Sequence, residues 1–209
     1  KTTISPLITP KWDQSEPFNN AIPTLGEGYS KFVTGCVATA MAQVMKYHGT
    51  PNNTIKGTGS KTYQINYNGT ILKTFTADFA NTTYDWDNML DDYSTGTPTE
   101  AQKNSVATLM YHCGVSVEMS YGSSASGGSS AAVVNVGPAL INYFGYDKSL
   151  QYLNRTNYSD NEWEQIVYDE LSNSRPVLYG GQSIDGGHAF ICDGYSTDDA
   201  KYHINWGWG

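Results

Sequence analysis

The 209-residue chain has little cysteine, little charge and no long apolar run. Three Cys residues cannot build a disulfide framework, and at least one thiol must be free. Charged residues make up only 15% of the chain, and 12 basic against 20 acidic residues give a net charge of −8. An acidic chain lacks the basic surface of a nucleic-acid binder. No apolar run approaches the roughly 18–20 residues of a membrane span, so neither a nucleic-acid partner nor a membrane span is expected.

Glycine and tyrosine are abundant instead, with 21 and 16 residues, and 39% of the chain is hydrophobic. This composition is that of a folded, β-containing protein rather than a disordered one. At about 150 residues per domain, the length fits one larger domain or two closely packed small ones. The chain starts at Lys1 with a polar stretch, without an initiator Met or a signal peptide, which indicates a processed product.

The first third of the chain predicts an extended arm, a helix and a hairpin. Residues 1–33 are Pro-rich and have little periodicity. Apolar residues at helical spacing then predict a helix that is capped by Thr34 and stopped by Gly49 and Pro51. An Asn-Gly pair between two strand-like runs predicts a hairpin over residues 61–75.

A second helix is predicted from its end signals. Thr97 as the cap, Pro98 in the first helical position and Glu100 as the partner of a capping box mark its start, and Gly114 marks its end. The alternating pattern of residues 115–119 predicts a strand directly after it.

The remainder is expected to contain a linker, two helices and three strands. The low-complexity stretch 122–130 is typical of a linker. The expected helices span residues 131–144 and, capped by Asp160, 161–173; the expected strands span 177–180, 187–195 and 202–208. The order of these expected helices and strands predicts an α+β protein that is helical to about residue 120 and β-rich over about 121–209.

Cys36 is the sharpest chemical feature, because it lies at the first turn of a predicted helix, directly after Gly35. The N-terminal end of a helix carries about half a positive charge, which stabilises a thiolate. Thiolates are the nucleophilic form of cysteine. The plainer interpretation is a small buried hydrophobic side chain, the commonest role of a lone Cys.

A thiol nucleophile needs a base, and His188 is the best candidate of the four His residues. It follows two glycines, which allow close approach of a substrate, and it opens an apolar strand. A structural turn histidine is the alternative. His48 and His112 lie near helix ends, where a core or dipole-compensating role is expected, and His203 lies inside the last strand.

A group that orients the imidazole and a pair of oxyanion donors complete the predicted chemistry. Asn205 follows His188 by 17 positions, on what should be the neighbouring strand, and its amide oxygen could accept from the imidazole N–H. A nearby indole could cover the pair from water, although core packing also explains the two Trp residues. The backbone N–H of Cys36 and the side chain of Gln14 are the predicted oxyanion donors.

At these residues the chain resembles the streptopain family of secreted bacterial cysteine peptidases, a branch of the papain-like fold, and within it the interpain-type enzymes. The similar blocks run through the chain in order, at residues 14–19, 34–48, 114–122, 186–190 and 202–209. The second and last blocks, residues 34–48 and 202–209, are long enough to be specific to this family.

The resemblance implies a papain-like α+β fold in one catalytic domain over residues 1–209, with a β half that is incomplete at its C-terminus. It implies a secreted endopeptidase made as a zymogen, with protein or peptide substrates and its own pro-segment as inhibitor. The sequence has neither Cys-x-x-Cys nor His-x-x-x-His spacing, so no metal is expected, and no cofactor is expected either. The implied site residues are Cys36 as nucleophile, His188 as base, Gln14 as oxyanion donor, Asn205 or Trp206 as the group that positions His188, and Ser126, Gly127 and Gly187 as walls of the substrate cleft.

Two other functions stay open on the sequence. A transglutaminase-like acyltransferase or amidase would use the same Cys and His with another acceptor. A non-enzymatic adhesin or carbohydrate binder would use the Tyr and Trp residues and would leave Cys36 buried and inert.

Overall fold

The computed structural model describes residues 1–49 and 55–209; Pro51, expected to help stop the first helix, lies outside these residues. The helices are α1 (Cys36–Gly49), α2 (Glu100–Ser116), α3 (Val136–Phe144) and α4 (Asp160–Ser172). The strands are β1 (Ser60–Tyr67), β2 (Thr70–Asp78), β3 (Val177–Ser183), β4 (Gly186–Ser196) and β5 (Lys201–Asn205). The α+β class predicted from the sequence is confirmed in the described residues.

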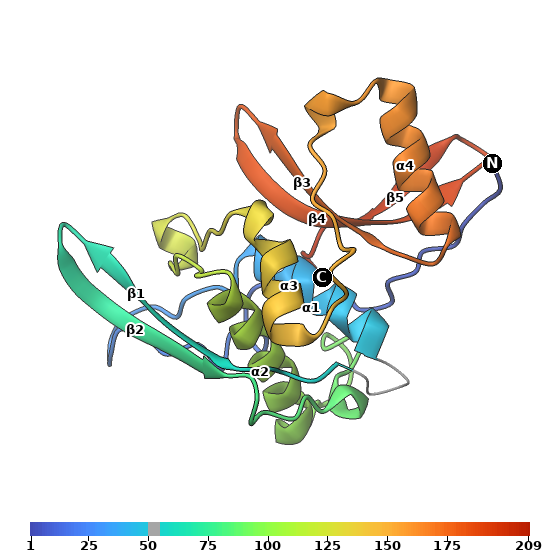
Figure 1. Cartoon of the computed structure of the whole chain (residues 1–209). Coiled ribbons are helices and arrows are strands. Elements are labelled where there is room, and N and C mark those ends of the chain that lie inside the picture. The colour runs from blue at the N-terminus through green and yellow to red at the C-terminus, as the bar shows by residue number, and fades with distance from the viewer. Residues whose placement is uncertain (50–54) are drawn as a thin grey trace.

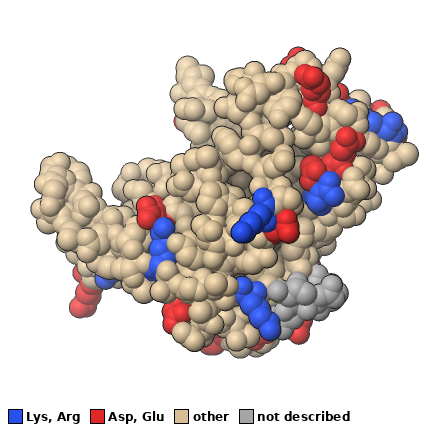
Figure 2. Space-filling model, in the orientation of Figure 1, with Lys and Arg blue, Asp and Glu red and all other residues tan. Residues whose placement is uncertain are grey.

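Two antiparallel sheets flank the helices, as Figure 1 shows. The hairpin β1–β2 projects to one side of α1, α2 and α3, and the three-stranded sheet β3–β4–β5 lies on the other side with α4 against it. A large apolar cluster joins α1, α2, α3 and β2, with Met41, Met110, Phe144 and Phe75 buried in it. The face drawn in Figure 2 carries only scattered charges of both signs, in keeping with the low charge content.

Strand β4 is the element that joins the two halves. Successive side chains of a strand point to opposite faces. Ile191 packs against Ala40 and Val44 of α1 on one face. Cys192 packs against Leu171 of α4 on the other. Helix α1, which begins at Cys36, is therefore fixed against the centre of the sheet.

The N-terminal arm is tied to the same sheet. Ile4 forms an isolated antiparallel bridge with Tyr195 of β4. The buried carboxylate of Asp193 lies where the register of β4 and β5 shifts, accepts from the Ile8 backbone N–H at 2.9 Å, and pairs with His203 Nδ1 at 2.6 Å. These contacts fix the arm to the sheet, from which the chain continues toward the start of α1.

The start and end of α2 differ from the sequence prediction. The capping box at Thr97, Pro98 and Glu100 is wrong, because Thr99 is the cap and shares a reciprocal pair of hydrogen bonds with Gln102. The strand over residues 115–119 and the end at Gly114 are wrong too, since α2 runs to Ser116. The apolar residues of this segment, Val115, Val117 and Met119, are core residues of the helix end and its turn, so burial rather than strand pairing explains their apolar character.

Other boundaries shift by one or a few residues. Gly35, not Thr34, precedes α1, and the Thr34 hydroxyl bonds to the Thr39 hydroxyl at 2.8 Å instead of capping. Ser159 caps α4 in a capping box with Glu162, so the expected Asp160 cap is wrong. The last strand ends at Asn205 rather than at residue 208. The proposed boundary near residue 120 stays a prediction.

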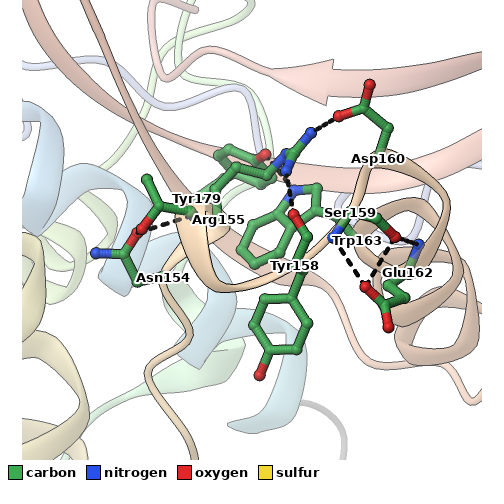
Figure 3. A network of polar contacts seen from close by, with 9 residues as sticks. Asn154, Arg155, Tyr158, Ser159, Asp160, Glu162, Trp163 and Tyr179 are labelled. Carbon is green, nitrogen blue, oxygen red and sulfur yellow. Dashed lines mark hydrogen bonds and ion pairs between the residues drawn. The ribbon is translucent and has the colours of Figure 1, made fainter.

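The N-terminal end of α4 is held to the sheet by a small polar network, drawn in Figure 3. The Arg155 guanidinium donates to the Tyr158 carbonyl at 2.9 Å and also pairs with Asp160. The Trp163 indole N–H donates to the Tyr179 hydroxyl of β3 at 2.5 Å. This network orients α4 over the face of the sheet opposite to α1.

The buried imidazole of His112 predicts an acid-sensitive core. Burial lowers the pKa of His112 to about 4, although the negative charge of Asp78 raises it by a smaller amount. The Nδ1 atom of His112 is hydrogen-bonded to the Tyr84 hydroxyl at 2.7 Å. The unfolded chain, with an ordinary His pKa near 6.5, therefore binds more protons between about pH 6.5 and 4. We expect the folded state to lose on the order of 2–3 kcal/mol as the pH falls through this window.

Urea unfolding of the wild type and of His112→Gln at several pH values between 4 and 7 measures this effect. The variant should be less stable at pH 7 and should show a flatter pH dependence over the window. Parallel curves for the two proteins would show that His112 does not carry the proton linkage.

Candidate active site

Cys36 is the first residue of α1 and is half-buried. Gly35 before it has φ +85°, and a β-carbon there would lie 2.7 Å from Met119 Sδ, so only glycine fits. The first N–H groups of a helix have no intrahelical partner and point outward with the positive end of the dipole. The backbone therefore offers both a thiolate-stabilising field and free N–H donors at the sulfur.

The other two cysteines are in a different environment. Cys113 and Cys192 are buried in the apolar core, which raises the pKa of the Cys113 thiol well above its ordinary value and that of Cys192 to about 12. Neither thiol has the helix-start position of Cys36.

Selective alkylation of Cys36 follows from this difference. Below about pH 7 a small alkylating agent should label Cys36 rapidly and leave Cys113 and Cys192 unlabelled in the folded chain, because only an accessible thiolate reacts. Timed labelling followed by mass mapping measures the three rates, and unfolded chain provides the control in which all three react. Equal labelling of the three cysteines in folded protein would contradict the assignment.

His188 lies near the start of β4, beside Cys36. The backbone N–H of the next residue, Ala189, donates to Cys36 Sγ at 3.4 Å. Within the described residues the hydrogen bond to this sulfur comes from Ala189 rather than from the His188 ring. Catalytic hydrogen bonds are often loose before substrate binds, so the neighbouring position is the informative observation.

The His188 ring is oriented by the Trp206 backbone carbonyl, which lies 2.8 Å from Nε2. A carbonyl oxygen can only accept, so Nε2 must carry the proton of this hydrogen bond. In the neutral ring the lone pair is then on Nδ1. The contact thus fixes the tautomer in which the other nitrogen can take a proton.

Two indoles cover the imidazole. The ring centroid of Trp208 lies 4.7 Å from that of His188, and the ring centroid of Trp206 lies 6.2 Å from it. Phe190 continues the aromatic group on the same strand at 6.3 Å. Both Trp side chains are exposed to solvent, so they shield the ring from water on one side rather than filling a core.

The Asn205 side chain does not hold the imidazole, contrary to the expected hydrogen bond. Its amide donates to the Pro10 carbonyl at 3.0 Å and exchanges two hydrogen bonds of 3.2 Å with the Gln43 amide. The difference arises because β5 ends at Asn205 and the chain turns, which presents the Trp206 carbonyl to His188 instead. Of the two residues expected to position His188, the structure brings Trp206 to the ring.

Gln14 reaches the same region through its backbone. Its carbonyl accepts from the Thr34 N–H at 3.0 Å, two residues before Cys36, and its side chain is half-buried. The arm that carries Gln14 is fixed by the buried Trp12, whose indole N–H donates to the Leu90 carbonyl at 2.8 Å. The backbone of Gln14 therefore lies close to the start of α1.

The Ser/Gly stretch is an ordered loop rather than a linker. A bridge between Ser120 and Ser130 closes it, and the Ser129 hydroxyl donates to the Val33 carbonyl at 2.7 Å, three residues before Cys36. Ser126 and Gly127 are exposed at its far end. Gly187 is exposed beside His188 on β4.

Gln43 was missed by sequence reasoning, although it lies in the block around Cys36. It is fully buried on α1. A fully buried Gln is unusual, but its burial cannot be read from the sequence, where it is one polar residue on an otherwise apolar helix. Only its spacing of seven residues from Cys36, two helical turns, could have indicated that the two share a helix face.

A thiol at a helix start, an imidazole on an adjoining antiparallel strand and an acceptor that orients the imidazole together define a papain-like thiol peptidase site. Comparison with known proteins gives the same class. The Peptidase C10 family model matches residues 12–209, and the chain belongs to this family.

Its relatives include several peptidases of known sequence or structure. Streptopain of Streptococcus pyogenes is 40% identical over 210 residues, which cover 95% of this chain and 50% of streptopain. The thiol protease/hemagglutinin PrtT of Porphyromonas gingivalis is 38% identical over 95% of this chain and 22% of its own length. The chain thus spans about half the length of streptopain.

Solved structures show the fold. Active interpain A of Prevotella intermedia superposes with a TM-score of 0.87 at 42% identity, over 99% of this chain and 82% of that one. A fragment of prointerpain A superposes with a TM-score of 0.85 over 99% and 62%. The papain-like cysteine peptidase fold and the streptopain-family relationship expected from the sequence are confirmed. Among the described residues, no helix is both long and apolar enough to cross a membrane.

Proposed function

We propose that the chain is the catalytic part of a secreted bacterial cysteine endopeptidase. Cys36 is its nucleophile, His188 its general base and acid, and the Trp206 carbonyl the group that orients His188. The single observation that carries the proposal is the Ala189 N–H on Cys36 Sγ, since it puts the strand of His188 at the nucleophile.

The reaction runs in two stages. The Cys36 thiolate attacks the substrate carbonyl carbon, and the protonated His188 gives its proton to the leaving amine as the peptide bond breaks. Water then attacks the thioester, His188 takes its proton, and the thiolate leaves. The oxyanion of both tetrahedral intermediates accepts from the Cys36 backbone N–H and the Gln14 amide.

The substrate is an extended peptide that lies between the Ser/Gly loop and the start of β4. Exposed Ser126 and Gly127 form one wall, and Gly187, without a side chain, lets the peptide backbone approach the other. Ser126 and Gly127 are exposed on a loop that Ser129 ties to the Val33 carbonyl, three residues before Cys36, and Gly187 is exposed next to His188, which supports this placement.

The enzyme acts outside the cell as the mature form of a zymogen whose pro-segment inhibits it. The match to a prointerpain A structure supports a zymogen. Proteins and peptides are its substrates.

Inactivation by an epoxide-type cysteine peptidase inhibitor tests the proposal. The inhibitor should modify Cys36 alone, one equivalent per chain, with a parallel loss of peptide hydrolysis. The same assay with an added primary amine separates hydrolysis from acyl transfer. Modification without any hydrolytic activity, or transfer to the amine in place of hydrolysis, would contradict a peptidase.

A further inference from the structure

We infer that the buried Gln43–Asn205 amide pair is the positioning device that fixes the His188 acceptor to the nucleophile helix. The inference deepens the proposed function and rests on it. It makes Gln43 a positioning residue and gives Asn205 an indirect role, through the Trp206 carbonyl, in place of contact with the imidazole.

The two side chains form a reciprocal pair between separate elements. Gln43 Nε2 donates to Asn205 Oδ1 at 3.2 Å, and Asn205 Nδ2 donates to Gln43 Oε1 at 3.2 Å. Gln43 is on α1, and Asn205 is the last residue of β5. Two bonds in opposite directions fix distance and orientation together, as a single bond does not.

Backbone groups lock the orientation of the Asn205 amide. Its Nδ2 donates to the Pro10 carbonyl at 3.0 Å, and its Oδ1 accepts from the Gly207 N–H at 3.0 Å. If the amide were flipped, its oxygen would face the Pro10 carbonyl oxygen and its NH₂ group would face the Gly207 N–H, and neither pair can form a hydrogen bond. All four hydrogen-bonding positions of the Asn205 side chain are therefore used.

The Gln43 carbonyl oxygen is locked in the same way. Besides Asn205, it accepts from the Trp12 backbone N–H at 3.3 Å. Gln43 is buried with 0% exposure, so each unmade bond would cost the desolvation of a polar group. The pair thus joins three segments, namely α1, the arm that carries Gln14, and the turn after β5.

The turn that is fixed in this way carries the Trp206 carbonyl. Trp206 lies between Asn205 and Gly207, which are joined by the Oδ1 bond, so its peptide group is held on both sides. Gly207 has φ +72°, and a β-carbon there would lie 3.1 Å from Thr39 Cγ2 on α1. The turn is consequently packed on the same helix, within two turns of Cys36.

A direct consequence concerns the distance between the two reacting side chains. Cys36 is fixed to α1, and His188 is oriented by the carbonyl of a turn that is itself bonded to α1. Without the pair, the turn would keep its bonds to Pro10 and lose the polar link to α1. A misplacement of a reacting group by about 1 Å can cost about 10²-fold in rate.

The test is Gln43→Met in the full chain, which keeps volume and removes both amide bonds. We expect kcat to fall by about 10- to 10²-fold with KM within about twofold, because chemistry and not binding is affected. The imidazole N–H of His188 that bonds to Trp206 should shift and exchange faster with water in the ¹H–¹⁵N NMR spectrum. In a double-mutant cycle, Asn205→Ala should add little to Gln43→Met.

Lys46→Met is the matched control. Lys46 is also buried on α1, one turn further along, and its ammonium donates to the Trp86 carbonyl at 2.6 Å, away from Asn205. This variant should lose stability and keep both kcat and the His188 N–H signal.

Three outcomes would overturn the inference: wild-type kcat in folded Gln43→Met, a loss that Lys46→Met reproduces, or an unchanged His188 signal. If Gln43→Met does not fold, Gln43→Asn, which withdraws the amide by one methylene, decides by the same measurements. If the wild type has no peptidase activity, the proposed function fails, and the NMR signal still decides the role of Gln43.

Discussion

Replacing His188 with alanine should lower kcat by at least about 10²-fold while the chain stays folded, because the same ring must activate the thiol and protonate the leaving amine. The side chain is half-buried near a strand end, and its partners among the described residues are a carbonyl and three aromatic rings. Its removal therefore leaves no buried charge and a modest change in packing. Steady-state kinetics on the processed chain, with circular dichroism to check folding, measures the effect.

His48→Ala is the matched control for this prediction. His48 is also half-buried, at the last turn of α1, where its ring packs on Tyr47 and Tyr146. Burial lowers the pKa of His48, so it is a neutral packing residue near neutral pH. This variant should lose some stability and keep its kcat. A His188→Ala enzyme with more than about a tenth of the wild-type rate would mean that the base is elsewhere.

The sequence predicted the groups of the site better than their contacts. Cys36 could be found because a Gly-Cys pair at a helix start is a local pattern, and His188 because two glycines precede an apolar strand. Their approach to one another depends on how β4 packs on α1, through Ile191 and Ala40, which no local pattern contains. The family resemblance supplied that step, and the structure supplies its physical cause.

The hydrogen-bond acceptor of His188, the Trp206 carbonyl, could not be predicted from the sequence. A side chain can be proposed from its chemistry, and Asn205 was the natural choice. A backbone carbonyl has no sequence signature, because every residue has one. The same limit applies to Gln43, whose role depends on its burial and on partners from the arm and from the turn after β5.

The sequence signals for the start and the end of α2 were also ambiguous. Two nearby sets of capping residues compete at the start of α2, and the one at Thr99 and Gln102 is formed. The alternating residues after Gly114 fit a strand by pattern, yet α2 continues to Ser116 because that segment is buried in the helical core. Tertiary packing decided both cases.

Gln14→Ala should lower kcat by roughly 10²–10³-fold, about 3–4 kcal/mol, with little change in KM. In the proposed mechanism the amide donates to the oxyanion, and such a donor matters more in the transition state than in substrate binding. Its position supports this role, since the Gln14 carbonyl is bonded to the Thr34 N–H, two residues before Cys36. Single-turnover kinetics on processed variants measures the chemical step directly.

Gln14→Glu makes the prediction sharper, because it keeps the size and shape of the side chain and replaces the donor with an acceptor. It also adds negative charge beside the oxyanion and the thiolate, so its kcat should be as low as that of Gln14→Ala or lower. Pro17, three residues on, stiffens the arm in all of these variants, since its ring fixes φ. A loss of backbone order is therefore not expected to contribute. Near-normal kcat in Gln14→Ala, or a loss that lies wholly in KM, would mean that other donors build the oxyanion hole.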